Sequence, residues 1–181
     1  PLPICKFCRA SLRRNANACQ GCALPLNGPG GALRYCRECL DRPPLWSSII
    51  APYVYEPSLA YLVQQWKYQN ESRLAALFAT LWLDAVETPP EVDLLVTVPL
   101  HWTRLLRRGF NQTELLLRDM QKACPALSNI DTDPGRVQKR RHTSHQVGQG
   151  ARERRGNLVG AFTVNQPCDN LRVAVIEDIV T

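Results

Sequence analysis

Six of the eight cysteines fall in three Cys-x-x-Cys pairs near the start of the chain, and they are the residues best suited to bind a metal ion. The pairs are Cys5/Cys8, Cys19/Cys22 and Cys36/Cys39. Zinc prefers four tetrahedral ligands, which proteins usually supply as two tight turns of two thiolates each. Thirteen residues separate the second and third pairs, a spacing typical of a zinc ribbon. The sequence therefore predicts a structural zinc ion bound by Cys19, Cys22, Cys36 and Cys39.

The first pair, Cys5 and Cys8, has two interpretations that the sequence leaves open. It could complete a metal site with the second pair, or it could be half of a ribbon whose other half precedes Pro1. We favour the second interpretation, because the chain starts without an initiator Met and stops at Thr181, which suggests a fragment cut at both ends. Redox chemistry is disfavoured, since a redox-active pair usually occurs once and near a βαβ pattern.

Two adjacent carboxylates, Glu177 and Asp178, form a second group of interest. They follow the apolar, β-branched run 171–176, which predicts a strand buried on both faces, as in parallel sheets. Ligands of open α/β sheets bind just beyond the carboxyl ends of the strands. The acidic pair is therefore a candidate ligand site, and the alternative is a buried strand that ends in a solvated acidic loop.

A basic loop follows the other predicted buried strand, residues 94–98. Arg104, Arg107 and Arg108 lie in this loop, and a helix is expected to begin after residues 109–112. A strand, a basic loop and a helix N-terminus together make an anion-binding site by geometry alone. The alternative is a solvated basic turn.

A second basic segment, residues 137–155, carries eight Lys, Arg and His residues with Gly148 and Gly150 between them. These are Lys139, Arg140, Arg141, His142, His145, Arg152, Arg154 and Arg155. A flexible basic loop can close over a diphosphate and exclude water, and it can also follow the backbone of single-stranded DNA. This segment contains no Phe, Tyr or Trp on which bases could stack, so the sequence favours the diphosphate.

The elements that must position these groups follow from hydrophobic spacing. Apolar residues recur at helical spacing in residues 59–66 and 74–85, while residues 49–55 read as a strand that Pro52 confines to an edge. The paired prolines at 43–44 interrupt regular structure. We therefore expect a cysteine-rich zinc-ribbon module at residues 1–44 and an α/β domain at residues 45–181.

Composition limits the class of protein and its partners. The chain has 181 residues, of which 45% are hydrophobic, as is normal for a globular protein. A four-thiolate zinc site would lower the net charge from +6 to about +4, so an anionic partner such as a diphosphate or a nucleic acid is expected. The sequence has no apolar run of transmembrane length and no signal peptide, so we expect no membrane insertion and a reducing, cytoplasmic location.

Several of these motifs resemble the ComF family. The most specific match is Val98-Pro99-Leu100 followed by Arg108-Gly109-Phe110-Asn111-Gln112. Glu177-Asp178-Ile179-Val180-Thr181 is similar to the opening half of the phosphoribosyl-diphosphate (PRPP) signature of type I phosphoribosyltransferases.

The remaining motifs extend the resemblance over the whole chain in the expected order. The cysteine segments 19–26 and 36–40 resemble the family's zinc-ribbon segment, and residues 140–148 and 155–162 resemble its mobile-loop region. Two departures are visible. Gly156 stands where a basic residue is commoner, and the turn that would bind the 5-phosphate after Thr181 is missing.

The resemblance implies a fold and a set of ligand residues. The fold is a phosphoribosyltransferase-like parallel sheet flanked by helices, truncated at the PRPP loop and preceded by a small zinc ribbon. Glu177 and Asp178 would hold the ribose hydroxyls, and Arg108 would neutralise the diphosphate. The PRPP-binding set is Glu177, Asp178, Thr181, Pro99, Arg108, Gly109, Asn111 and Gln112. The mobile basic loop would contribute Arg140, Arg141, Thr143, Gln146, Arg155 and Asn157.

Three functional interpretations remain after this comparison. The first is a PRPP-binding protein or phosphoribosyltransferase, in which Mg²⁺ accompanies PRPP and stabilises the leaving diphosphate. No residue is an obvious chemical base, so the sequence does not decide whether catalysis occurs, and a fragment without the phosphate turn is expected to be inactive. The second is a non-catalytic scaffold for single-stranded DNA on the same fold. The resemblance associates both with DNA uptake, natural transformation or the use of external DNA, and with DNA-uptake machinery proteins as partners. The third is a purely structural zinc module, which the acidic pair at a strand end argues against.

Overall fold

The computed structural model of the chain describes residues 4–26, 34–69, 71–141 and 158–180. The chain divides into two compact units, residues 1–63 with Val180 and residues 64–179 with Thr181. This division falls within helix α3 (Pro57–Tyr68). It lies beyond the paired prolines at which the sequence places the end of the zinc-ribbon module, and that boundary stays a prediction. No helix in the described ranges combines the length and the apolar character needed to cross a membrane.

The first unit contains little regular structure. Its short helices are α1 (Lys6–Ala10) and α2 (Arg37–Asp41), and α3 begins near its end with Pro57, whose fixed φ suits a first helical position. Few of its apolar side chains are buried; those of the described residues are Leu12, Cys19, Ala23, Cys39 and Val63. The described part of this unit therefore has no large apolar core to stabilise it.

The strand predicted at residues 49–55 is wrong. Tyr53 forms only an isolated antiparallel bridge with Arg14. Pro52 has no N–H group for a ladder, although its carbonyl accepts a hydrogen bond from the Asn15 N–H at 2.9 Å. The segment is therefore attached to the unit by separate hydrogen bonds and by the contact of Arg14 with the Tyr53 ring, and not by a sheet.

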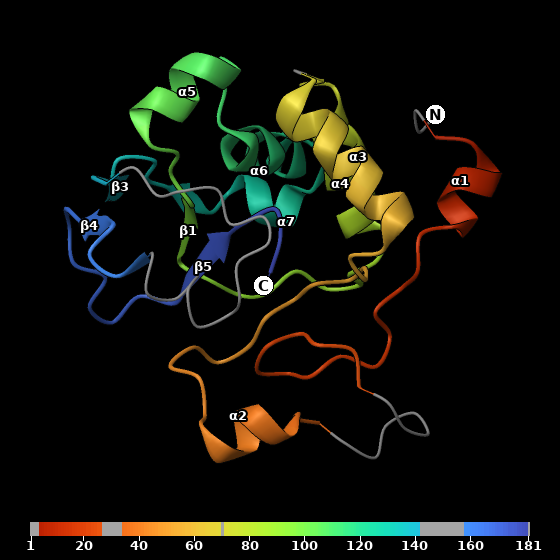
Figure 1. Cartoon of the computed structure of the whole chain (residues 1–181). Helices are drawn as coiled ribbons and strands as arrows, with labels where there is room; N and C mark the ends of the chain where they lie inside the picture. The colour runs from red at the N-terminus through yellow and green to blue at the C-terminus, as the bar shows by residue number, and fades with distance from the viewer. Residues whose placement is uncertain (1–3, 27–33, 70, 142–157, 181) are drawn as a thin grey trace. The chain divides into compact units, whose positions relative to one another are not determined.

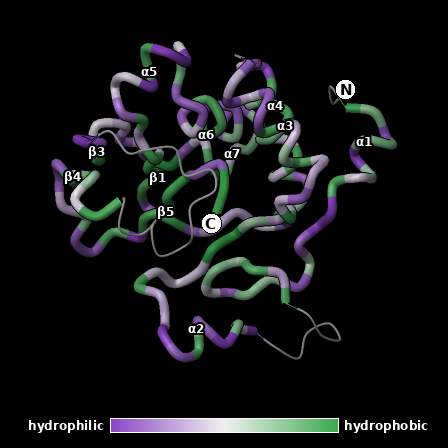
Figure 2. Tube along the Cα trace, viewed as in Figure 1, coloured by the Kyte–Doolittle hydropathy of each residue, from purple (hydrophilic) through white to green (hydrophobic). Residues whose placement is uncertain are grey.

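The second unit is built on a three-stranded parallel sheet with helices packed around it (Figure 1). The strands are β1 (Leu94–Thr97), β2 (Asp131–Thr132) and β5 (Val173–Ile176), in the order β2-β1-β5. All four residues of the central strand β1 are buried, as the apolar run predicts. Figure 2 shows this concentration of apolar residues in β1 and β5. The mixed α/β architecture with a parallel sheet flanked by helices is thus confirmed.

Strand β5 differs from its prediction. It begins at Val173 instead of Leu171, and among the described residues it pairs only with β1. Side chains alternate between the faces of a strand, so Ile176 packs against the helical core while Val175, on the opposite face, is 63% exposed. β5 is therefore an edge strand with one open face in the described structure, and the prediction of burial on both faces is wrong.

Helices supply most of the core of this unit. They are the second half of α3, α4 (Leu74–Leu83), α5 (Trp102–Arg108), α6 (Gln112–Ala123) and α7 (Pro125–Ser128). The buried cluster comprises Trp66, Ala75, Ala79, Leu116, Met120 and Leu127. Helical spacing predicts α3 and α4 correctly, and α6 buries Leu116, Leu117 and Met120.

A second, two-stranded sheet pairs the first residues of the basic segment with a strand that follows the segment in the sequence. Strands β3 (Val137–Lys139) and β4 (Phe162–Val164) are antiparallel, with Lys139 opposite Phe162. The N–H of Arg140 continues the pairing by donating to the Ala161 carbonyl at 2.9 Å. This ladder holds the start of the basic segment beside residues 161–164.

Asp93 and Arg172 connect the amino ends of β1 and β5. The backbone N–H of Arg172 donates to Asp93 Oδ2 at 2.8 Å, and its guanidinium donates to Asp93 Oδ1 at 2.9 Å. These bonds from Arg172 lower the pKa of Asp93 to about 2. The pair fixes the register in which Leu94 lies opposite Val173 and Thr97 lies opposite Ile176.

Candidate functional site

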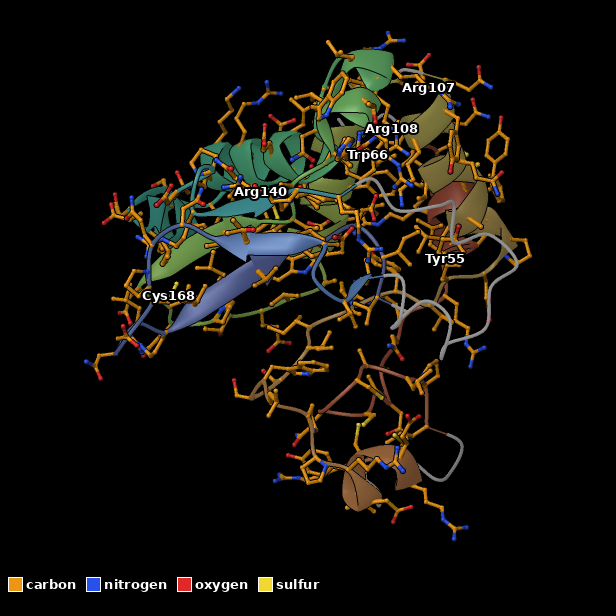
Figure 3. The ribbon with its side chains drawn as sticks, turned by 60° about the vertical axis from the view of Figure 1, so that its left-hand side comes forward. Tyr55, Trp66, Arg107, Arg108, Arg140 and Cys168 are labelled. Atoms are coloured by element: carbon orange, nitrogen blue, oxygen red, sulfur yellow. The ribbon has the colours of Figure 1, made fainter. Side chains whose placement is uncertain are left out.

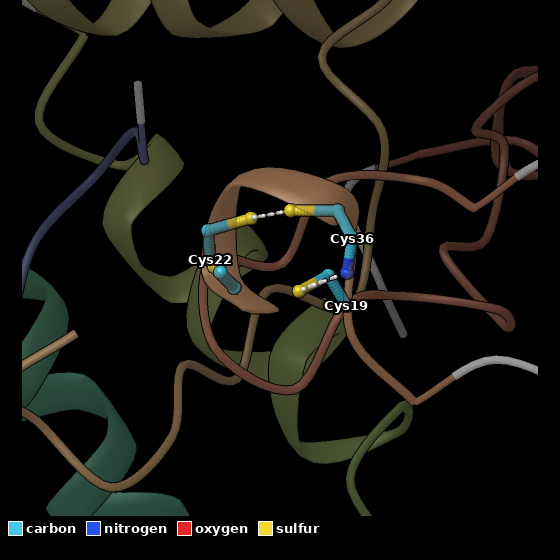
Figure 4. Close-up of side chains that lie close together, drawn as sticks. Cys19, Cys22 and Cys36 are labelled. Atoms are coloured by element: carbon cyan, nitrogen blue, oxygen red, sulfur yellow. Dashed lines mark hydrogen bonds between the residues drawn. The ribbon is translucent and has the colours of Figure 1, made fainter. Parts of the chain in front are cut away.

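The four cysteines predicted to bind metal come together in the first unit. Their Sγ atoms all lie within 4.8 Å of one another, and the Sγ atoms of Cys22 and Cys36 are 3.6 Å apart (Figure 4). Zn–S bonds of about 2.3 Å in a tetrahedron place sulfurs about 3.8 Å apart, so only a small contraction is needed. Cys19, Cys22, Cys36 and Cys39 could therefore bind a structural metal such as zinc.

Backbone groups shape this cluster. The Cys36 N–H donates to Cys19 Sγ at 3.2 Å, and the Ala23 N–H donates to the Cys19 carbonyl at 2.8 Å, which closes a tight turn around the first two ligands. Gly21 lies inside this turn, and a Cβ there would approach Cys39 Sγ to 2.9 Å. Only glycine leaves room for the thiols to converge. The Trp46 indole N–H donates to the Gly21 carbonyl and holds the turn from the other side.

The thiols of the cluster differ in acidity. Burial opposes ionisation of Cys19, but backbone N–H groups led by that of Cys36 outweigh it and lower its pKa to about 6. Burial and a hydrogen bond with Cys22 raise the pKa of Cys39 far above its usual range. One thiolate thus forms readily, while the thiols of Cys22 and Cys39, whose pKa values are raised, resist ionisation. A bound dication would remove this conflict by stabilising all four as thiolates.

Cys5 and Cys8 do not join this cluster in the described part of the chain. Both are exposed, and the Cys8 N–H donates to Cys5 Sγ at 3.4 Å at the start of α1. This backbone hydrogen bond lowers the pKa of Cys5. The side-chain hydrogen bond between the two thiols raises the pKa of Cys8. Which cysteines complete a site with this pair stays open.

In the second unit, the acidic pair lies where two parallel strands end. Glu177 and Asp178 directly follow β5, and the Val98 N–H donates to the Ile176 carbonyl at 3.1 Å. The loop that begins with Val98 and Pro99 therefore runs beside the acidic pair, as expected for neighbouring parallel strands.

Asp178 is held by a lysine that the sequence did not indicate. Lys67 Nζ, at the end of α3, lies 2.7 Å from Asp178 Oδ2, and only 7% of the Asp178 side chain is exposed. Arg108 also interacts electrostatically with Asp178. The guanidinium of Arg108 lies 5.5 Å from the ring centre of Tyr68, which follows Lys67. One cation thus contacts this carboxylate directly and a second interacts with it electrostatically.

Glu177 has a different environment from its neighbour. Protein atoms surround its carboxyl group, although other parts of the residue reach solvent. This desolvation is the main cause that raises the pKa of Glu177 to about 8, and the adjacent Asp178 adds to it. Its Oε1 accepts a hydrogen bond from the Asp178 N–H at 3.0 Å. Lys139 of β3 interacts electrostatically with Glu177, and burial lowers the pKa of Lys139. The two acids are therefore unequal.

The Arg108–Gln112 motif spans the end of α5, the loop at residues 109–111 and the start of α6. The basic loop predicted to carry Arg104, Arg107 and Arg108 is wrong, because these residues lie in helix α5. Gly109 ends α5 with φ of 77°, a left-handed conformation that favours glycine. Asn111 caps α6 and donates from Nδ2 to Glu114 Oε1 at 2.9 Å, while Thr113 Oγ1 donates to the Val98 carbonyl at 2.9 Å. Gln112 is buried, and its Nε2 has no hydrogen-bond partner among the described residues. Asn111 is thus engaged within the loop, and Arg108 is the residue of the motif that reaches the acidic pair.

The predicted mobile-loop residues are only partly covered. Thr143, Gln146, Arg155 and Asn157 lie outside the described residues, as does Thr181 of the predicted PRPP-binding set. Arg140 and Arg141 follow β3 and are exposed, and the Arg141 guanidinium donates to the Val159 carbonyl at 2.8 Å. Figure 3 shows Arg140 near the end of β3 and Arg107 and Arg108 on α5.

Lys67, Tyr68 and Lys139 are the residues that sequence reasoning missed at this site. Lys67 and Tyr68 follow Trp66 at the end of an amphipathic helix, where a lysine usually faces solvent. Lys139 belongs to the basic segment, but nothing in that segment distinguishes it from its neighbours. No local pattern reveals these residues, because their roles depend on contacts between distant parts of the chain.

The chain is similar to several curated bacterial proteins. The DNA utilization protein YhgH of Salmonella typhi is 33% identical over 184 residues, covering 98% of this chain and 78% of that protein. YhgH of Escherichia coli (strain K12) is 29% identical over 187 residues with the same coverage. Competence protein F of Haemophilus influenzae is 31% identical over 199 residues, covering 98% of this chain and 84% of that protein.

Two other comparisons give no match. No protein-family model matches the chain, and no solved structure is significantly similar to it. The full-length similarity to the curated proteins, one of them Competence protein F, agrees with the motif at Arg108–Gln112. The chain belongs to the ComF family.

Proposed function

We propose that the protein binds PRPP or a related phosphoribosyl ligand at Glu177 and Asp178, on a phosphoribosyltransferase-like fold. The observation that carries this proposal is the acidic pair at the end of β5, with Lys67, Arg108 and Lys139 around it. Carboxylates can accept hydrogen bonds from ribose hydroxyls, and the cations can offset the charge of phosphate groups.

Mg²⁺ would enter this site with the ligand. It is usually bound by substrate phosphates and one or two carboxylates, and here it would help to neutralise the diphosphate. Glu177 is the carboxylate available for it, because the Lys67 ammonium already contacts Asp178. Whether the bound ligand is transferred to an acceptor, which would make the protein a phosphoribosyltransferase, is a separate part of the proposal.

We also propose that the protein acts in DNA uptake or in the use of external DNA, in the cytoplasm and with DNA-uptake proteins as partners. The names of its relatives, DNA utilization protein and Competence protein F, support this biology. In the same proposal, zinc bound by the four clustered cysteines stabilises the first unit and takes no part in chemistry, because an all-thiolate site leaves no position for water.

NMR spectroscopy tests the ligand part directly. Mg-PRPP is added to the ¹⁵N-labelled chain, and we expect shifts confined to residues 98–100, 108 and 176–180. Mg-diphosphate and ribose 5-phosphate are then added separately. Shifts caused by Mg-diphosphate report on the cations, and shifts caused by ribose 5-phosphate report on the acidic pair. The matched control is Asp169→Asn, which neutralises an exposed acid of the same unit and should leave the shifts unchanged. Shifts that are absent at millimolar Mg-PRPP, or scattered over the surface, would contradict the proposal.

A single-stranded-DNA scaffold is the second candidate, and the structure contributes an observation in its favour. Trp102 at the start of α5 is 65% exposed and precedes Arg104 and Arg107 on the same helix. Exposed aromatic rings beside cations are what base stacking and phosphate binding require. The basic segment itself lacks such rings, so α5 would supply them.

Fluorescence anisotropy with a labelled oligonucleotide distinguishes the two candidates. If the scaffold is correct, the affinity should fall steeply with salt, and Trp102→Ala should weaken binding by about 1–3 kcal/mol. Leu106→Ala, an exposed substitution on the same helix, is the control. Binding that Trp102→Ala leaves unchanged would remove α5 from the DNA interface.

A further inference from the structure

Tyr68 is the last residue of α3, and the cations next to it interact with the acidic pair. Lys67, the preceding residue, has its Nζ 2.7 Å from Asp178 Oδ2. The Arg108 guanidinium lies over the Tyr68 ring, 5.5 Å from the ring centre, and it also interacts electrostatically with Asp178. An aromatic ring therefore lies close to the site that we propose for a phosphoribosyl ligand.

The Tyr68 ring is oriented from one side and stays open to solvent elsewhere. A guanidinium over the face of an aromatic ring is attracted to its π electrons, and Arg108 is partly buried, so this contact restricts the ring. Even so, 47% of Tyr68 is exposed, whereas Trp66, two residues earlier on the same helix, is buried in the core. Tyr68 therefore presents an ordered apolar surface that the described part of the chain leaves partly uncovered.

This surface is expected on the side of the ligand where a base would be attached. In the proposed site, Glu177 and Asp178 would hold the ribose hydroxyls, and Arg108 would neutralise the diphosphate, which PRPP carries on C1 of its ribose. A nucleoside carries its base on the same carbon. Because Arg108 and Tyr68 are in contact, a base on C1 would lie within reach of the Tyr68 ring.

We propose that Tyr68 is a specificity residue whose ring stacks on a planar base, so that the acidic site binds nucleoside 5′-monophosphates more tightly than ribose 5-phosphate. This inference rests on the proposed function, because it takes the positions of the ribose and of the diphosphate from it. It adds the chemical class of a further group on the ligand, a purine or pyrimidine ring. Every base has a π face, so stacking supplies affinity for nucleotides without selecting one base.

Trp102 is the other exposed aromatic residue of the second unit among those described, and its position differs. It begins α5, whereas Arg108 ends that helix. With a rise of 1.5 Å per residue, the two lie about 9 Å apart along the helix axis. The ring that Trp102 contacts is that of His101, with 5.7 Å between the ring centres. Tyr68 is therefore the exposed ring that contacts a residue of the proposed site, and a mononucleotide bound there would stack on it.

Calorimetry on the whole chain with two ligands tests the role of Tyr68. Adenosine 5′-monophosphate (AMP) carries a base that ribose 5-phosphate lacks, and the wild type should bind AMP about 5- to 150-fold more tightly, as one base–aromatic stack provides. Tyr68→Leu keeps an apolar side chain under Arg108 but removes the ring, so this preference should disappear. Tyr68→Phe should retain it, as should Tyr61→Ala, the control at an exposed tyrosine of the same helix. A preference for AMP that Tyr68→Leu leaves unchanged would overturn the proposal.

Proton NMR gives a readout that a purely structural role of Tyr68 would not produce. The adenine protons of AMP should shift upfield on binding to the wild type and to Tyr68→Phe but not to Tyr68→Leu, because only the first two place an aromatic ring over the base.

The inference and the proposed function fail in different ways. If Mg-PRPP and ribose 5-phosphate bind but the base adds no affinity, the stacking role is wrong and the proposed function stands. If AMP binds through Tyr68 while Mg-PRPP and ribose 5-phosphate do not bind, the proposed function is wrong and the stacking role stands. If none of the three ligands binds, both are wrong.

Discussion

Each of the two units brings together side chains that repel one another when ionised, and the two units do so by different means. In the first unit, four thiols converge with only a few buried apolar side chains around them. In the second, two carboxylates lie together at the end of a sheet with an extensive apolar core and protein cations as counter-ions. The first arrangement carries no cation of its own, so a bound metal ion would stabilise it, whereas the second carries its cations within the chain. If the proposed sites are correct, binding is coupled to folding in the first unit and is added to a finished fold in the second.

Loss of the metal ligands should produce the largest effect. Cys22→Ser combined with Cys39→Ser should abolish metal binding and unfold the first unit, because structural zinc sites contribute about 10–16 kcal/mol to small metal-dependent folds. Elemental analysis gives the zinc content, and amide NMR reports each unit separately. Cys124→Ser, which removes a thiol outside the cluster, is the control. Full zinc occupancy in the double variant would contradict the assignment and direct attention to Cys5 and Cys8.

A cavity in the apolar core should affect the second unit without changing the metal content. Met120 is buried in the cluster on α6, so Met120→Ala should lower the free energy of unfolding by about 2–5 kcal/mol. Leu106→Ala on α5 removes an exposed side chain and should change it by less than about 0.5 kcal/mol. Urea unfolding with zinc analysis measures both. A loss of zinc in Met120→Ala would show that the two units do not fold by separate means.

Neutralising one acid should weaken ligand binding while leaving the fold intact. Asp178→Asn removes a charge-assisted acceptor, which is expected to cost about 1.5–3 kcal/mol, or roughly ten- to a hundredfold in affinity for Mg-PRPP. Calorimetry supplies the affinity, and circular dichroism checks the fold. Equal affinity in the variant and the wild type would mean that the pair is not a ribose site, and the DNA scaffold would become the better explanation.

Added bulk at Gly21 should weaken metal binding without removing a ligand. A Cβ at Gly21 would meet Cys39 Sγ at 2.9 Å and Cys39 Cβ at 3.3 Å, so Gly21→Ala should cost about 1–3 kcal/mol through overpacking. In the control Gly135→Ala, the nearest atom to the new Cβ lies at 3.6 Å, an ordinary contact. Competition with a chromogenic zinc chelator compares the two. Equal zinc affinity would indicate that the turn adapts without cost.

A pH dependence of stability should originate at Glu177. Its pKa is raised from 4.5 to about 8 on folding, so the folded state binds more protons between these values and its stability falls as the pH rises through this range. Glu177→Gln should lack this decline and gain stability relative to the wild type above pH 8. Urea unfolding at pH 5, 7 and 9 gives the difference. A constant difference between the two proteins would show that Glu177 titrates alike in both states.

Sequence reasoning succeeded where local pattern determines the structure. The cysteine spacing predicted that Cys19, Cys22, Cys36 and Cys39 come together, and apolar runs or helical spacing predicted β1, α3 and α4. It failed where the outcome depends on tertiary partners. The apolar run before Glu177 indicated burial, but burial of a strand requires neighbours on both sides and β1 is the one that the described structure provides for β5. Lys67 was not predicted for a similar reason, because no residue near it in the sequence indicates that Asp178 is its partner.

The Asp93–Arg172 pair has a consequence at the opposite end of the sheet. Successive side chains of a strand point to opposite faces, so a slip of β5 by one residue along β1 would turn every side chain of the strand over. Such a slip would carry Glu177 to the place where Asp178 now meets Lys67. The bonds from Arg172 to Asp93 oppose this slip, and the low pKa of Asp93 keeps them intact down to strongly acidic pH. Residues at the amino ends of the strands thereby help to determine which of the two acids meets Lys67.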